Sequence, residues 1–152
     1  MGYTLGIDIG TFESKGVLVD DTGRIVSMAA RPHQMIVPCP GWAEHRAEED
    51  WWGDFVGITR TLLADSGIRA EEIRAVATSA IGPCMLPVDA TGTPLINGVL
   101  YGVDTRATDQ IAALNARIGE APRFPAASIK LRSMAARLHV WKITTRGRTS
   151  VR

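Results

Sequence analysis

Two short apolar runs joined by a turn open the chain and constrain its fold more than any other segment. They occupy residues 3–9 and 14–20, and glycine and polar residues bound them. Apolar or β-branched runs of this length with such boundaries are typical of β-strands. We therefore expect an N-terminal pair of strands, with the carboxylate of Asp8 near the end of the first one.

The turn between these runs carries groups that suit an anion. Gly10 gives the backbone freedom to turn consecutive N–H groups toward one concavity, and Thr11, Ser14 and Lys15 add hydroxyls and a positive charge. Mg²⁺ prefers a carboxylate together with phosphate oxygens, so Asp8 is a candidate magnesium ligand, directly or through water. An ordinary hairpin with an acidic turn explains these residues equally well.

Length and composition fit one soluble domain. The 152 residues are 45% hydrophobic and 22% charged. No apolar run approaches the roughly 20 residues of a membrane span, and the first strand begins too early for a signal peptide. Cys39 and Cys84 have neither metal-ligand nor redox spacing, which is typical of reduced thiols in a cytosolic protein. We expect a cytoplasmic protein.

Charge is distributed unevenly along the chain. Residues 121–152 contain eight Lys or Arg and no Asp or Glu, whereas residues 1–120 contain nine basic and sixteen acidic residues. A shift this sharp indicates a boundary. We therefore divide the chain into a body, residues 1–120, and a basic tail, residues 121–152. The acidic body argues against a nucleic-acid binder.

The rest of the body predicts further elements by periodicity and by glycine and proline punctuation. In order these are a strand at 24–31, a helix from about 47 to Gly67, a buried strand at 73–79, a strand at 85–89, extended structure at 94–101 and a helix at 105–118, stopped by Gly119. The apolar face of the first helix is expected to carry Trp52, Phe55, Thr59, Leu62 and Leu63. The order β-β-β-α-β-α predicts an α/β domain. Its mixed sheet opens with an antiparallel three-strand meander and carries helices on its faces, the ribonuclease-H-like arrangement of actin-like ATPases and sugar kinases.

Five motifs follow one another along the body. They are Gly6–Thr11 with Ser14 and Lys15, then Pro40–His45, Ala77–Ser79, Asp89–Pro94 and Tyr101–Arg106. In this order they resemble five features of the FGGY carbohydrate kinases, a family that includes glycerol kinase, xylulokinase and gluconokinase. These features are the first phosphate loop, the P-G-W-x-E-H/Q segment, the start of a substrate loop, the D-x-x-G-x-P hairpin and the W-x-D-x-R segment. Five ordered matches are more specific than any one of them.

The resemblance implies an ATP-dependent kinase that transfers a phosphoryl group to a sugar or polyol hydroxyl. Its cofactors would be ATP and Mg²⁺, with Asp8 associated with the metal and Gly10, Thr11, Ser14 and Lys15 near the transferred phosphate. Phe12 and Glu13 depart from the small hydroxyl residues frequent in the family. No membrane partner is expected, because no apolar run is long enough to span a bilayer. The resemblance also implies a full-length protein that is often homo-oligomeric.

By the same resemblance, the residues expected to bind the substrate are Ile81, Gly82, Tyr101, Asp104 and Arg106. Glycerol kinases carry an Arg-Glu pair and xylulokinases a Met-His pair in the loop where this chain has Ala-Ile-Gly-Pro, so the sugar stays open. A helix-terminal charge and a surface arginine are an equally good interpretation of Asp104 and Arg106.

Several polar and aromatic residues have a structural interpretation as well. Trp42 fits a packing anchor better than a platform for a sugar. Glu44 and His45 fit a satisfied polar corner better than a catalytic pair. His33 and His139 have no partner that the sequence identifies.

The family's general base is an aspartate that we expect beyond residue 152. We therefore expect no catalytic residue within this chain and an inactive fragment of a kinase. The basic tail is interpreted as frame-shifted or disordered; the alternative is a genuine basic helix, which would make the chain a non-catalytic binding or regulatory fragment. A ribonuclease-H-like nuclease is disfavoured because the strand at 73–79 carries no carboxylate.

Overall fold

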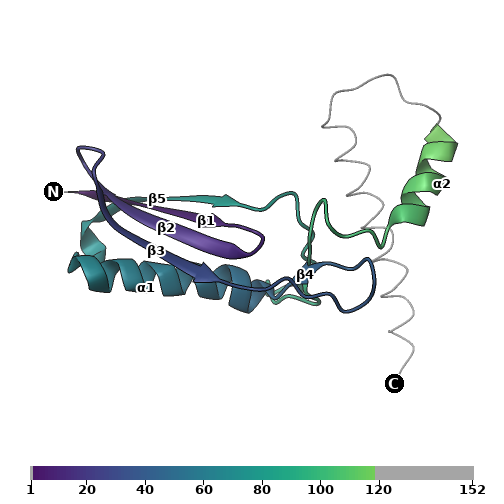
Figure 1. The fold of residues 1–152 in the computed structure, drawn as a ribbon, viewed down its shortest axis with the longest axis horizontal. Coiled ribbons are helices and arrows are strands. Elements are labelled where there is room, and N and C mark those ends of the chain that lie inside the picture. The colour runs from purple at the N-terminus through teal and green to yellow at the C-terminus, as the bar shows by residue number, and fades with distance from the viewer. Residues whose placement is uncertain (1, 119–152) are drawn as a thin grey trace.

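The computed structural model of the chain describes residues 2–118. A mixed four-stranded sheet lies at one end of it, and a long helix covers one side of that sheet (Figure 1). The basic tail, the helix stop at Gly119 and His139 all lie outside the described residues.

Four strands build the central sheet in the order β3-β2-β1-β5. They are β1 (Tyr3–Ile9), β2 (Glu13–Asp20), β3 (Ile25–Pro32) and β5 (Ile73–Ala80). β1 pairs antiparallel with β2, β2 pairs antiparallel with β3, and β1 pairs parallel with β5. The predicted opening meander and the mixed character of the sheet are confirmed.

The remaining elements are helices and a small second sheet. They are β4 (Glu44–His45), the π-helix η1 (Ala47–Gly53), α1 (Asp54–Ser66), the short 3₁₀ helix η2 (Ala70–Glu72), β6 (Gly98–Val99) and α2 (Thr108–Ile118). Gly67 ends α1 in a left-handed conformation with φ of 69°, as the sequence predicts. β4 and β6 pair antiparallel, which places His45 beside Gly98.

The core lies between α1 and one face of the sheet. Strand side chains alternate between faces, so every second residue of β1 and β2 points toward α1. The buried set is Leu5, Ile7, Ile9, Leu18, Ile58 and Leu62. Burying such side chains stabilises the fold by about 1.5–3 kcal/mol each, so this layer fixes which face of the sheet is covered.

Gly16 sits at the closest approach of helix and sheet. A Cβ atom built on Gly16 would overlap the side chain of Ile58 and lie 3.1 Å from Leu62. Glycine is therefore required here by the distance between the layers, and α1 is able to pack directly on the β1–β2 ladder.

The opposite face of the sheet, which we call the open face, is formed in β1 by Thr4, Gly6 and Asp8 and in β2 by Lys15 and Val17. Thr4, Asp8 and Lys15 are exposed. Among the described elements, α1 packs on β1, β2 and β3 from the other side.

Several predictions about individual elements are wrong. The strand at 73–79 is not buried: Arg74–Ala80 are exposed because β5 is an edge strand beyond the reach of α1. Residues 85–89 form isolated bridges, Met85 to Val99 and Val88 to Pro94, in place of a strand. The last helix begins at Thr108, three residues later than expected.

The first helix also differs in part from its prediction. Leu62 faces the core as expected, but Ile58 was missed and Trp52 is 61% exposed. Residues 47–53 wind as a π-helix, which shifts the faces of the residues that follow. Within residues 2–118, no helix combines the length and apolar character needed to cross a bilayer.

Replacing Gly16 with alanine is expected to push α1 away from the sheet. The added methyl group overlaps Ile58, so G16A should lower the free energy of unfolding by about 1–3 kcal/mol. Urea unfolding followed by circular dichroism measures this. The matched control is G6A on the open face, where the new Cβ has Val17 at 3.4 Å and ordinary contact is expected. Equal midpoints for G16A and G6A would contradict this account of the layers.

Candidate functional site

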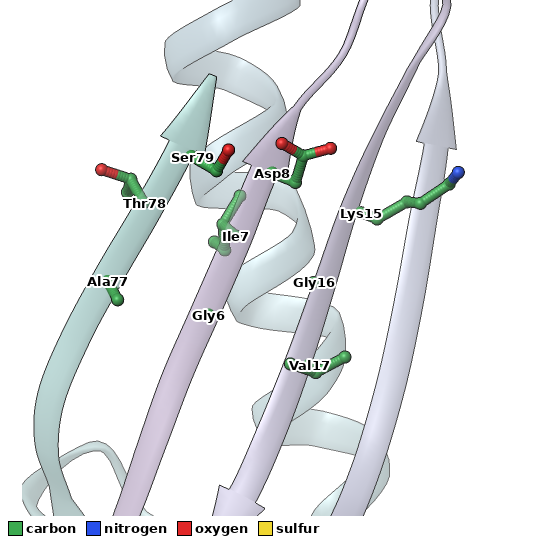
Figure 2. Close-up of a pocket in the computed structure, with 9 residues that line it drawn as sticks. All are labelled: Gly6, Ile7, Asp8, Lys15, Gly16, Val17, Ala77, Thr78 and Ser79. Carbon is green, nitrogen blue, oxygen red and sulfur yellow. The ribbon is translucent and has the colours of Figure 1, made fainter. Parts of the chain in front are cut away.

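Asp8 lies on the open face at the carboxyl-terminal end of β1. Its cross-strand neighbours are Lys15 on β2 and Ser79 on β5. These three residues border a shallow hollow of about 370 Å³, which we call the open-face hollow (Figure 2). The rest of its lining is mostly small or backbone: Gly6, Ile7, Gly16, Val17, Ala77 and Thr78.

The donor set around Asp8 suits a magnesium ion that shares its ligands with phosphate. Asp8 is exposed, and within residues 2–118 no three His, Cys, Asp or Glu side chains gather closely enough to hold a metal by themselves. Mg²⁺ is commonly held by one or two carboxylates, with phosphate oxygens and water completing its shell. The residues present therefore fit this binding mode and do not form an all-protein cage.

The structure does not bring all of the predicted phosphate residues to one face. Ser14 pairs with Ile9 and points to the α1 side, where it is fully buried, and its Oγ has no hydrogen-bond partner in the described part of the chain. Lys15 shares the open face with Asp8, but its side chain runs away from Asp8 in Figure 2 and its Nζ lies 3.1 Å from the carboxylate of Glu13. Only Asp8 and Lys15 of this set border the hollow.

Gly10 was expected to help turn backbone N–H groups toward an anion, but its own N–H is used within the turn. Its φ is not positive, and its N–H donates to the carbonyl oxygen of Glu13 at 3.1 Å, so this amide closes the turn and is not offered to an anion. A Cβ at Gly10 would lie 2.6 Å from the same oxygen. Glycine is needed for the tightness of the turn.

The three carbonyl groups of the turn all accept hydrogen bonds from two histidines, His33 just after β3 and His45 in β4. Nε2 of His33 lies 3.1 Å from the oxygen of Gly10, and the backbone N–H of His33 donates to the oxygen of Phe12 at 3.0 Å. Nε2 of His45 lies 2.9 Å from the oxygen of Thr11. No local pattern in the sequence indicates these contacts, because the histidines are more than twenty residues from the turn.

Each histidine is held in turn by a second group. Nδ1 of His33 lies 2.8 Å from Asp54 at the start of α1, and Asp54 is also paired with Arg31 at 3.1 Å. The indole N–H of Trp51 donates to Nδ1 of His45 at 3.0 Å. The two imidazole rings meet edge to face, with centroids 4.8 Å apart. Together these residues form a buried polar layer beneath the turn.

The partners of His45 define its protonation. Because Nδ1 accepts from Trp51, the ring hydrogen is on Nε2, which donates to Thr11. Burial lowers the pKa of His45, and the nearby charge of His33 lowers it further, so the neutral form is favoured. The prediction that His45 belongs to a polar corner agrees with these contacts.

The substrate-side residues Asp104 and Arg106 are part of a buried ionic cluster, which we call the Arg106 network. The Arg106 guanidinium lies 2.7 Å from both Glu44 and Asp104, and it stacks 3.9 Å above the ring of Trp42. Asp104 also accepts the N–H of Ala43 at 2.8 Å. Burial opposes the charge, but the hydrogen bonds that Arg106 donates to Asp104 and Glu44 keep the pKa of Arg106 above its ordinary value.

The alternative interpretation of Arg106 as a surface residue does not agree with the structure, since its side chain is only 9% exposed. Trp42 contacts Arg106, as a packing anchor would. Ile81 lies elsewhere, directly after β5, where its N–H donates to the oxygen of Ile9 at 2.8 Å. The roles of Ile81, Gly82 and Tyr101 in substrate binding stay predictions.

Comparison with known proteins gives consistent results. Residues 3–140 match the family model for the N-terminal domain of the FGGY family of carbohydrate kinases. The glycerol kinases of Polaromonas naphthalenivorans and Azorhizobium caulinodans are 35% and 36% identical over 122 and 129 residues, which cover 80% and 82% of this chain and 24% of each relative.

Solved structures show the same fold. A xylulose kinase from Rhodospirillum rubrum and a xyloylose kinase from Brucella ovis superpose with TM-scores of 0.67 and 0.69; both are 26% identical and cover 76% of this chain. The predicted sugar-kinase fold is thus confirmed. The chain spans about a quarter of the length of the relatives that it matches, 24% for the curated proteins and 23% and 24% for these structures.

Removing Arg106 is expected to destabilise the protein strongly. R106M leaves Glu44 and Asp104 buried without their counter-charge, which should cost about 3–5 kcal/mol of unfolding free energy. Urea unfolding at pH 7 measures the change. The matched control is R60M on the exposed side of α1, which should change stability by about 0.5 kcal/mol or less. An R106M midpoint equal to that of R60M would show that the network contributes little.

Acidification is expected to destabilise the protein through His45. The folded-state pKa of His45 is below its ordinary value of 6.5, so the unfolded chain takes up this proton first and stability falls as pH drops below about 6.5. H45Q keeps a donor for Thr11 and cannot titrate, so its melting temperature should fall less between pH 7.5 and pH 5. The surrounding groups His33, Asp50 and Arg46 remain in both proteins. Identical pH slopes would contradict the assignment.

Proposed function

Because the chain belongs to the FGGY family of carbohydrate kinases, we propose that its central sheet forms part of the phosphate-binding side of an ATP-dependent kinase. The reaction is transfer of the γ-phosphoryl group of ATP to a hydroxyl of a sugar or polyol. The observation that carries this proposal is Asp8, an exposed carboxylate at the end of β1 beside the open-face hollow.

In this proposal Asp8 holds Mg²⁺, directly or through water, and the metal when bound neutralises charge on the phosphate oxygens. The turn from Gly10 to Thr11 and the cation of Lys15 lie at the same end of the sheet as Asp8. Lys15 reaches a phosphate only by leaving Glu13, an exposed ion pair that is cheap to break. Ser14 contributes through the backbone of β2, since its hydroxyl lies on the α1 side.

The substrate proposal remains at the level of a sugar or polyol. Relatives named glycerol kinase and structures named xylulose kinase support this class without choosing within it. Ile81 and Gly82 follow β5 at the same end of the sheet as Asp8, which supports placing the acceptor hydroxyl near them. The Arg106 network, with Tyr101 beside it in the sequence, would act mainly by holding the adjoining loops.

Three further parts of the proposal concern the whole chain: its activity, its location and its oligomeric state. The family resemblance puts the general base beyond residue 152, and this chain spans about a quarter of its relatives, so we expect the 152 residues alone not to catalyse the transfer. Cytoplasmic location and a homo-oligomeric full-length protein stay predictions.

An assay of ADP release tests the proposal. The 152-residue chain and any longer gene product that contains it are each supplied with ATP, Mg²⁺ and, in turn, glycerol, D-xylulose or D-gluconate. We expect acceptor-dependent ADP release from the longer product, loss of that activity when EDTA removes the metal, and a fall in kcat on the order of 10²-fold in D8N.

The matched control is D65N, which makes the same substitution on the exposed surface of α1 and should retain wild-type kcat. Wild-type kcat in D8N would overturn the role of Asp8. Acceptor-independent ADP release, or none with any of the three acceptors, would contradict the reaction class.

A further inference from the structure

The polar layer beneath the turn between β1 and β2 has a role that the kinase proposal does not assign. His33 and His45 come from the segment after β3 and from β4, yet both imidazoles are directed at carbonyl oxygens of consecutive turn residues, Gly10 and Thr11. His45 is completely buried, and the side chain of His33 is 4% exposed. Neither ring lines the open-face hollow.

The geometry of the peptide bond turns these contacts into a constraint on the amides. In a trans peptide unit the C=O of one residue and the N–H of the next point in opposite directions. The peptide bonds of the turn are trans. Holding the carbonyl of Gly10 therefore directs the N–H of Thr11 away from His33, and holding the carbonyl of Thr11 directs the N–H of Phe12 away from His45.

The two imidazoles lie between the turn and the helical layer. His33 contacts Asp54, the first residue of α1, and His45 contacts Trp51 in η1. The N–H groups of Thr11 and Phe12 consequently point toward the other side, the side on which Asp8 and Lys15 stand. In the described part of the chain neither N–H donates a hydrogen bond to another group. Consecutive N–H groups directed to one side form an anion-binding concavity.

We propose that His33 and His45 are positioning residues that aim the N–H groups of Thr11 and Phe12 at a phosphate by pinning the carbonyls of Gly10 and Thr11. This inference rests on the proposed function for the identity of the anion, but the orientation of the amides does not depend on it.

The two rings perform this task in different protonation states. Nε2 of His33 faces a carbonyl oxygen, and Nδ1 faces a carboxylate that is also bound to Arg31 and hence ionised. Both partners can only accept, so a ring that donates from both nitrogens, the imidazolium form, is the one that satisfies both contacts. His45 accepts from Trp51 and donates from Nε2, so it is neutral. A cation and a neutral ring avoid the repulsion that two adjacent imidazolium ions would have.

NMR of the ¹⁵N-labelled 152-residue chain tests the inference. Long-range ¹H–¹⁵N spectra at pH 7 should show both nitrogens of His33 protonated and His45 protonated at Nε2 alone. In H45L the amide resonances of Thr11 and Phe12 should shift and their hydrogen exchange should accelerate, while the amide of Gly23, at the distal hairpin, stays in place. H45Q restores a donor at the position of Nε2 and should return the resonances toward those of wild type. H33F and H33Q test the hydrogen bond from His33 to the carbonyl of Gly10 in the same way: H33F removes the donor and H33Q restores it.

A destabilised control separates local positioning from general loss of structure. L63A shortens a half-buried side chain near the far end of α1 and should lower stability without moving the Thr11 and Phe12 resonances. Unchanged Thr11 and Phe12 amides in H45L, an equal displacement in L63A, or no recovery in H45Q would each overturn the inference.

Titration with inorganic phosphate then separates this inference from the kinase proposal. If the wild-type amides respond to phosphate, H45L should bind it about fivefold to tenfold more weakly, the change expected for one lost hydrogen bond, and H45Q should recover affinity. If they do not respond, the phosphate role of the turn fails, and the amide shifts of H45L and H45Q decide the positioning role by themselves.

Discussion

The distance between α1 and the β1–β2 ladder is the constraint on which the rest of this structure depends. Gly16 lets the helix approach until Ile58 and Leu62 fill the space above the strands. This packing covers one face of the sheet and fixes the register of alternating side chains. Asp8 is exposed on the open face because its neighbours Ile7 and Ile9 are committed to the core. A one-residue slip of β1 would bury the carboxylate.

The same helical layer also holds the residues that contact the turn between β1 and β2. α1 begins at Asp54, η1 precedes it with Trp51, and these two residues hold the histidines that contact the turn. The helical layer thus acts twice: its apolar side positions the strands, and its amino-terminal side positions the loop between them. The start of the helical layer therefore contacts Gly10 and Thr11 through two buried imidazoles.

The sequence is sufficient for the features that depend on local periodicity. Tyr3–Ile9 alternates, Gly67 stops a helix, and the order of strands and helix leaves few sheets to choose from, so the meander and fold class were predictable. The exposure of β5 was not, because an apolar run has the same composition at the edge of a sheet and at its centre. The contacts of His33 also join distant segments, and no spacing rule reports a hydrogen bond from a side chain to a remote carbonyl.

Ser14 shows why the candidate site was predicted only in part. Sequence proximity placed Ser14 and Lys15 on one turn, but adjacent residues in a strand point to opposite faces, so only one of them can share a face with Asp8. The buried hydroxyl of Ser14 then requires a reason other than direct phosphate contact. A larger apolar side chain at this position would press against the helical layer, and a glycine would loosen β2 next to the turn. A small residue beside Gly16 thus preserves the close packing that keeps the opposite, open face in register.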